Sequence, residues 1–169
     1  MAEYNFVLKN QNIEYEGLFI VRDLYQVINK FLKDKGYDWK EPKHHEYIGD
    51  NSKYVELQLE PWKKVSDYVE LVLRTNIKIY NMKDVVIEKD GRKLNMQKGK
   101  IVIRLDAILK TDYEGKWEEP PIKYFLRALF DKFIYKRYTN NFANQLKQDA
   151  HELVSNIKSY LNLYNYKLN

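Results

Sequence analysis

Three histidines are the only imidazole groups with which this chain of 169 residues could ligate a metal or move a proton. His44 and His45 are adjacent, and neighbouring side chains of a strand point to opposite faces, so the two rings are poorly placed to share one ion. His151 has no recognisable nucleophile motif beside it. The chain has no Cys, which removes thiolate ligands, disulfides and a cysteine nucleophile. We expect no metal site, no cofactor and no catalytic residues.

Loops that bind phosphate need closely spaced glycines ahead of a helix, because the backbone itself must approach the anion. Gly91 and Gly99 are too far apart for this and fall in expected strand turns, so nucleotide hydrolysis is not indicated. Three carboxylates gather around Trp117, namely Glu114, Glu118 and Glu119. Such acids can perform acid–base chemistry or hold a cation, but a solvated turn is the simpler explanation. The sequence favours a non-enzymatic protein.

The remaining candidate residues are basic. Lys and Arg outnumber Asp and Glu by 29 to 24, which gives a formal net charge of +5 and an isoelectric point near 9.1. The excess lies in two segments, residues 89–100 and 121–139, each with five bases and one acid. The first segment supplies the candidate partner-binding residues Lys89, Arg92, Lys93, Lys98 and Lys100. The second supplies Lys123, Arg127, Lys132, Tyr135, Lys136, Arg137 and Tyr138.

Tyrosines are interspersed with the cations of the second segment, and the chain has 15 of them. Lys and Arg neutralise phosphates while aromatic rings stack on unpaired bases, so such a surface suits RNA or a ribosome. The alternative is that a hairpin tip and an exposed helix face are charged because they meet water. AT-rich codons also account for part of the tyrosine content.

Strands are the best-defined elements of the middle of the chain. Apolar and polar residues alternate over residues 55–60, 65–79 and 101–110, which predicts antiparallel strands with one face on a core and one in water. Asp90-Gly91 between two short alternating segments predicts a type I′ hairpin. Residues 3–10 read as a first strand, followed by a loop or strand extension over 11–16. Pro42 makes residues 37–48 an edge or bulged strand.

Helices are expected after the first strand and at the C-terminal end. Apolar residues from Val21 to Leu32 recur at helical spacing, and Gly36 closes this helix. Pro120-Pro121 opens a helical section with one apolar stripe over residues 122–133 and another over 142–164. The two stripes are out of phase, which predicts a break or bend near residues 136–141.

These elements predict one α+β domain over residues 1–169, with strand, helix and sheet in 1–119 and a helical section in 120–166. A curved antiparallel sheet of about six to seven strands packs on a long, bent or broken C-terminal helix. The element order resembles the helix-grip fold of the START-like superfamily, which includes polyketide cyclases and lipid-transfer proteins. The resemblance rests on topology alone, and the single long helix after the first strand departs from the pair of short helices usual there.

The resemblance implies an alternative function, a carrier with an apolar cavity between the sheet and the C-terminal helix. Its lining would come from both layers, with the candidate residues Leu71, Leu73, Ile103, Leu105, Trp117, Phe125 and Leu129. A third possibility is a structural subunit of a larger assembly, a virion included. The apolar surplus of residues 160–168 indicates packing under the sheet or a homo-oligomer through the C-terminal helix.

The location expected from the sequence is cytoplasmic. The N-terminus lacks the basic and then apolar pattern of a secretory signal. No uncharged apolar run is long enough to predict a transmembrane helix. The leading expectation is therefore a non-enzymatic binding module that contacts RNA, a ribosome or a protein assembly through its basic, tyrosine-rich surface.

Overall fold

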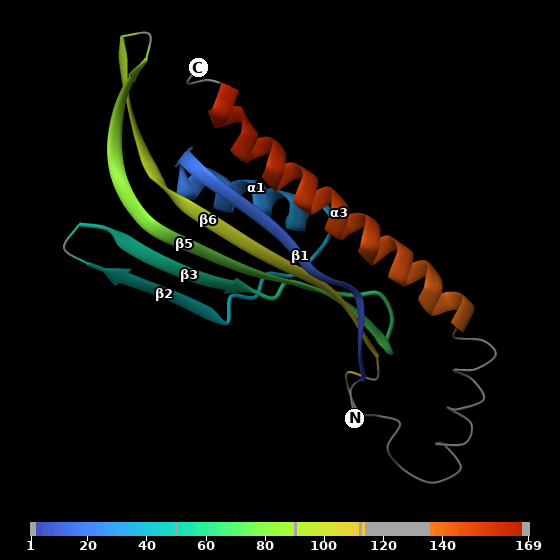
Figure 1. The fold of residues 1–169 in the computed structure, drawn as a ribbon. Coiled ribbons are helices and arrows are strands. Elements are labelled where there is room, and N and C mark those ends of the chain that lie inside the picture. The colour runs from blue at the N-terminus through green and yellow to red at the C-terminus, as the bar shows by residue number, and fades with distance from the viewer. Residues whose placement is uncertain (1–2, 50, 90, 112, 114–135, 167–169) are drawn as a thin grey trace.

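The computed structural model describes residues 3–49, 51–89, 91–111, 113 and 136–166, and they form an α+β fold (Figure 1). The elements in chain order are β1 (Glu3–Phe19), α1 (Val21–Asp34), β2 (Lys43–Ile48), β3 (Lys53–Leu59), β4 (Trp62–Lys64), β5 (Val69–Lys89), β6 (Arg92–Thr111) and α3 (Lys136–Tyr166). All strands belong to one six-stranded sheet. The predicted fold class is thereby confirmed in its general form.

The sheet is antiparallel, with the strand order β1-β6-β5-β3-β2 and with β4 paired to β5 beside β3. Its centre is the long hairpin of β5 and β6, whose register runs from Val69 opposite Thr111 to Lys89 opposite Arg92. The separate alternating segments of the sequence thus merge into two strands of 21 and 20 residues. Strand β1 continues through residues 11–16, so that segment is a strand extension and not a loop.

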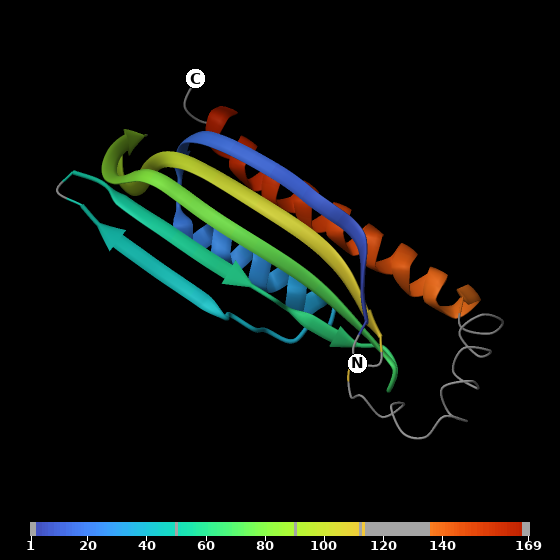
Figure 2. The same ribbon diagram turned by 60° about the horizontal axis from the view of Figure 1, so that its bottom comes forward.

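Both helices lie on the same face of the sheet, and Figure 2 shows the other face without a helix of the described residues over it. The covered face supplies the core, where alternate residues of the strands are buried against α1 and α3. Among the fully buried side chains of the sheet are Leu59, Leu71, Leu73, Ile79, Ile101, Ile103 and Leu105. Removal of this apolar surface from water holds the layers together.

Each helix presents one apolar stripe to the sheet. In α1 the buried side chains are Leu24, Ile28, Phe31 and Leu32. In α3 they are Leu146, Ala150, Leu153, Ile157, Tyr160 and Leu161. This spacing of three and four residues is what a helix needs to bury one face, and it explains why these segments coil and do not extend.

Two polar contacts fix the helices to each other and to the chain between them. The hydroxyl of Tyr160 donates to the Ile20 carbonyl at 2.7 Å and accepts from its N–H at 3.1 Å, directly ahead of α1. Buried Asp149 accepts from the Tyr37 hydroxyl at 3.0 Å and lies 3.5 Å from the Lys35 ammonium. Polar side chains of α3 thus bind the residues just before and just after α1.

The β5–β6 hairpin departs from regular pairing at one place. Tyr80 is opposite Lys100 and Lys83 is opposite Lys98, so two residues of β5 stand against the single Gly99 of β6. Asn81 in this bulge has φ = 51°, in the left-handed region that Asn tolerates better than most residues. The bulge turns every later side chain of β5 to the opposite face.

The C-terminal section is described only from residue 136 onward. Over the described residues 136–166 α3 is one continuous helix, which includes residues 136–141, where the sequence predicted a break or bend. The first predicted stripe, residues 122–133, lies outside the described residues, so a long bent or broken helix is not confirmed. The extent of the single domain over residues 1–169 also stays a prediction. Within the described residues, no helix combines the length and apolar character needed to cross a bilayer.

The bulge requires glycine at its partner position, which gives a first prediction. A Cβ on Gly99 would lie 2.8 Å from the Tyr80 carbonyl oxygen, closer than real Cβ contacts come. We expect Gly99→Ala to lower the free energy of unfolding by about 1–3 kcal/mol, the usual cost of overpacking. Denaturant unfolding measures this. Lys98→Gln, at the exposed neighbouring position, should leave the stability within about 0.5 kcal/mol. Equal stability of Gly99→Ala and the wild type would contradict the close approach.

Candidate functional site

The face of the sheet that faces away from α1 and α3, here called the open face, is built from the other half of each strand. Its side chains line up in rows across the strands because partners in an antiparallel pair share a face. One row joins Tyr47, Tyr54, Tyr80 and Lys100 from β2, β3, β5 and β6. The next joins residues 45, 56, 78 and 102, and Gln58, Asn76 and Arg104 follow.

Charge is segregated between the two faces of the β5–β6 hairpin. Between Asn76 of β5 and Arg104 of β6 its open face carries six described cations, which we call the basic ribbon: Lys78, Lys83, Arg92, Lys98, Lys100 and Arg104. No carboxylate occupies the open face of either strand from Asn76 through the described residues to Arg104. The acids Asp84 and Glu88 are paired with Gln97 and Lys93 on the opposite face. The opposite face is the one that is covered by the helices, since Gln97 is paired there with buried Phe19 of β1.

The bulge at Asn81 and Met82 produces this segregation. Met82 belongs to the core together with Ile79, three residues earlier, whereas strict alternation would place them on opposite faces. Without the extra residue, Asp84 and Glu88 would share the face of Lys78. With it, Lys83 takes that face instead, and the cations continue toward the hairpin tip.

Most of the basic ribbon is not neutralised by the rest of the described chain. Lys83, Arg92, Lys98 and Arg104 are exposed and form no ion pair with another described residue. Lys100 lies 3.1 Å from Glu14 of β1, and Lys78 lies 3.8 Å from Glu56 of β3. Exposed cations at this density attract anions, and the attraction weakens as salt screens it.

An apolar strip runs along the outer part of the basic ribbon. It consists of two cross-strand pairs, Val85 with Met96 and Ile87 with Leu94. Met96 is buried, whereas Leu94 keeps 43% of its surface exposed. Lys83 and Lys98 form the next pair toward the sheet centre, so cations and apolar contact area lie on one surface.

Toward the sheet centre the basic ribbon meets a depression of about 270 Å³. Its lining comes from β3, β5 and β6, namely Glu56, Asn76, Lys78, Tyr80, Val102 and Arg104. Glu56 accepts a hydrogen bond from the Lys43 ammonium at 2.9 Å, and this bond is the main reason that its pKa is lowered. The one acid of the depression is therefore a carboxylate shared between two lysines.

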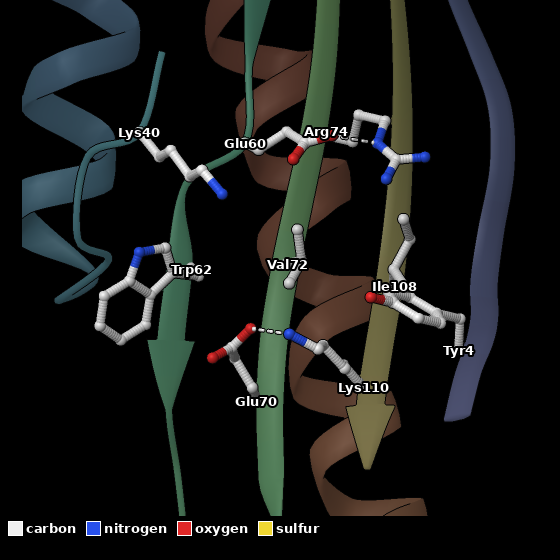
Figure 3. Close-up of a pocket in the computed structure, with 9 residues that line it drawn as sticks. All are labelled: Tyr4, Lys40, Glu60, Trp62, Glu70, Val72, Arg74, Ile108 and Lys110. Carbon is white, nitrogen blue, oxygen red and sulfur yellow. Dashed lines mark hydrogen bonds and ion pairs between the residues drawn. The ribbon is translucent and has the colours of Figure 1, made fainter. Parts of the chain in front are cut away.

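A second pocket on the open face lies near the other end of the sheet (Figure 3). Both of its acids are ion-paired, since Arg74 lies 2.6 Å from Glu60 and Lys110 lies 3.3 Å from Glu70, and Lys40 is a third cation of the lining. Its volume is about 120 Å³, below the roughly 300 Å³ of ordinary ligand pockets. We therefore regard this small, largely ion-paired pocket as part of the sheet surface and not as the candidate site.

The basic residues predicted from the sequence fall into three groups. Arg92, Lys98 and Lys100 lie on the open face, Lys93 lies on the opposite face, and Lys89 is placed by its register alone. Lys123, Arg127, Lys132 and Tyr135 lie outside the described residues. Lys136, Arg137 and Tyr138 begin α3, and only their backbone is described. Sequence reasoning missed Lys78, Lys83 and Arg104, which join the site only through pairing of β5 with β6.

The residues of the alternative carrier pocket also divide. Leu71, Leu73, Ile103 and Leu105 are fully buried within the core under the helices. Trp117, Phe125 and Leu129 lie outside the described residues, so the pocket stays a prediction.

The histidines lie apart from the basic ribbon. His44 and His45 are exposed neighbours on edge strand β2, opposite Leu57 and Glu56 respectively. The His44 ring nitrogen lies 3.1 Å from a Glu41 oxygen. His151 is exposed on α3. Among the described residues, no group of three or more His, Asp or Glu side chains is arranged to hold a metal ion.

Comparison with known proteins adds no relationship. No protein-family model matches the chain, and no curated protein matches it significantly in sequence. The helix-grip resemblance therefore remains one of element order.

The ion pair at the edge of the depression gives a second prediction. Because hydrogen bonding to Lys43 favours the ionised form of Glu56, the carboxyl of Glu56 should titrate below its ordinary range. Lys43→Gln removes that donor and should raise the Glu56 pKa. Carboxyl carbon shifts followed by NMR across acidic pH measure both values. The Lys53→Gln variant is the control, since Lys53 pairs with Asp84 on the other face. An unchanged Glu56 pKa in Lys43→Gln would show that the bond is absent in solution.

Proposed function

We propose that the chain is a non-enzymatic binding module that holds the phosphate backbone of RNA against the basic ribbon. The observation that supports this most is the segregation of charge on the β5–β6 hairpin. Between Asn76 and Arg104 its open face carries six described cations and no described acid, while Asp84 and Glu88 lie behind it. A surface that was charged merely for solubility would need no such separation.

The dimensions of the ribbon suit a polymer more than a small ligand. Its cations extend along two neighbouring strands from Arg104 to Arg92, a span of 13 residues of β6 counted inclusively. At about 3.3 Å per residue this is roughly 40 Å, enough for several successive phosphates. A small anion would contact only two or three of these groups. Binding through many phosphates releases counterions and makes affinity steeply dependent on salt.

The charged side chains of the open face are not arranged for reaction. Among the described residues, Glu56, Glu60 and Glu70 are each held in an ion pair with a neighbouring Lys or Arg. Carboxylates neutralised in this way are poor candidates for proton transfer at neutral pH. This supports a binding role, with ribosomal particles as one form that the RNA could take.

A matched pair of charge variants tests the proposal. Arg92→Gln/Lys98→Gln removes two cations from the open face. The control, Lys93→Gln/Lys158→Gln, also removes two cations, one from the opposite face of β6 and one from α3. We expect the first variant to weaken RNA binding and to make the negative slope of log affinity against log salt shallower by about 1.4. The second should bind as the wild type does. Fluorescence anisotropy with a labelled RNA over a salt series measures both quantities.

Two results would contradict the proposal. One is the absence of wild-type binding to RNA at low salt. The other is equal weakening by the two double variants, which would show that only net charge matters. Selective capture of another protein through the open face, without RNA affinity, would replace RNA by a protein partner.

A further inference from the structure

A row of three tyrosines borders the inner end of the basic ribbon, and we call it the tyrosine row. Tyr47, Tyr54 and Tyr80 come from three adjacent strands and lie side by side on the open face. The ring centroids of Tyr47 and Tyr54 are 6.1 Å apart, and those of Tyr54 and Tyr80 are 5.3 Å apart. Strand pairing therefore builds one aromatic surface from positions separated in the sequence.

The tyrosine row keeps ring surface available to a ligand. Tyr47 and Tyr80 expose 63% and 38% of their surface, while Tyr54 between them is half-buried and supports both. Burial, reinforced by nearby Glu56, raises the pKa of the Tyr54 hydroxyl, so this group stays neutral at physiological pH. The rings thus offer aromatic surface without adding negative charge.

Cations surround the tyrosine row on the side of the hairpin. Lys100 of β6 is the direct partner of Tyr80, and Lys83 lies beyond the bulge on the same face. Tyr80 also lines the 270 Å³ depression with Lys78 and Arg104. The acid of that depression, Glu56, is paired to Lys43 and Lys78. Aromatic and cationic groups therefore meet within the same surface.

We infer that the tyrosine row stacks on unpaired bases, and hence that the RNA bound by the basic ribbon is single-stranded at this place. This inference rests on the proposed function. Phosphates would lie along Lys78, Lys100 and Arg104 while bases turn toward the rings. Exposed aromatics on an antiparallel sheet can stack two or three bases in this way. A continuous duplex keeps its bases stacked on one another and could use only the cations.

The first experiment uses the wild-type protein and three labelled RNAs of equal length. These are a uridylate strand of about 12 nucleotides, an abasic strand with the same phosphates, and a duplex. We expect the uridylate strand to bind at least about fivefold more tightly than the abasic strand, since stacking adds to each engaged base. The salt dependence of the two should agree, because their phosphates are the same. The duplex should bind more weakly than the uridylate strand.

The second experiment changes the tyrosine row. Tyr47→Leu/Tyr80→Leu removes the outer rings and should reduce affinity for the uridylate strand by about fivefold or more, with no change for the abasic strand. Tyr47→Phe/Tyr80→Phe keeps the rings and should bind as the wild type does. Thermal unfolding of both variants shows whether the sheet is intact. Quenching of intrinsic fluorescence by the uridylate strand should be absent with the abasic strand and should be reduced in Tyr47→Leu/Tyr80→Leu.

The outcomes separate this inference from the proposed function. Equal affinity for uridylate, abasic and duplex RNA, with loss in Arg92→Gln/Lys98→Gln, would overturn stacking and leave phosphate binding in place. No binding of any RNA would overturn both. A single-stranded DNA of the same length, bound as tightly as the uridylate strand, would keep the stacking role and widen the ligand to any single strand.

Discussion

The structure depends on a sheet that is buried on one face only. In the inner part of β5 and β6, the side chains that face α1 and α3 are apolar except for Thr75, because the helices exclude water from that side. Leu71, Leu73, Ile103 and Leu105 are completely buried there. The residues between them meet no helix of the described chain (Figure 2). These open-face residues need not be apolar, and they form rows of cations and tyrosines.

The β-bulge at Asn81 and Met82 converts this freedom into a polarised surface. A shift of one position exchanges the two faces of a strand for all residues beyond it. Here the shift carries Asp84 and Glu88 behind the hairpin and brings Lys83, Val85 and Ile87 forward. Gly99 permits the shift, since the Tyr80 carbonyl occupies the space of a Cβ. The electrostatics of the candidate site thus originate in a backbone irregularity.

Much of the architecture could be predicted from local patterns. The alternation over residues 55–60, 65–79 and 101–110 corresponds to parts of β3, β5 and β6, although β5 begins only at Val69. The helical spacing corresponds to α1, and Gly91 lies in the turn between β5 and β6. The site was harder to predict. Strict alternation would place Asp84 on the same face of β5 as Lys78, and the sequence pattern gives no sign of the bulge that prevents this. Lys78 and Arg104 become neighbours of the hairpin cations only through pairing between β5 and β6.

The tyrosine row illustrates the same limit. Tyr47 and Tyr54 flank one turn, but Tyr80 joins them through the register of β3 on β5, which a single sequence does not contain. The second basic segment predicted to bind RNA, residues 121–139, has no described side chains. The cations that support RNA binding are therefore those gathered on one face of the β5–β6 hairpin.

Methyl NMR on the β5–β6 hairpin tests most directly whether one face of it is the binding surface. Val85, Ile87 and Leu94 belong to the open face, whereas Val86, 64% exposed, belongs to the other. On addition of single-stranded RNA, we expect the methyl signals of the first three residues to shift and those of Val86 to stay in place. Shifts of Val86 equal to those of its neighbours, or no shifts at all while RNA is bound, would contradict it.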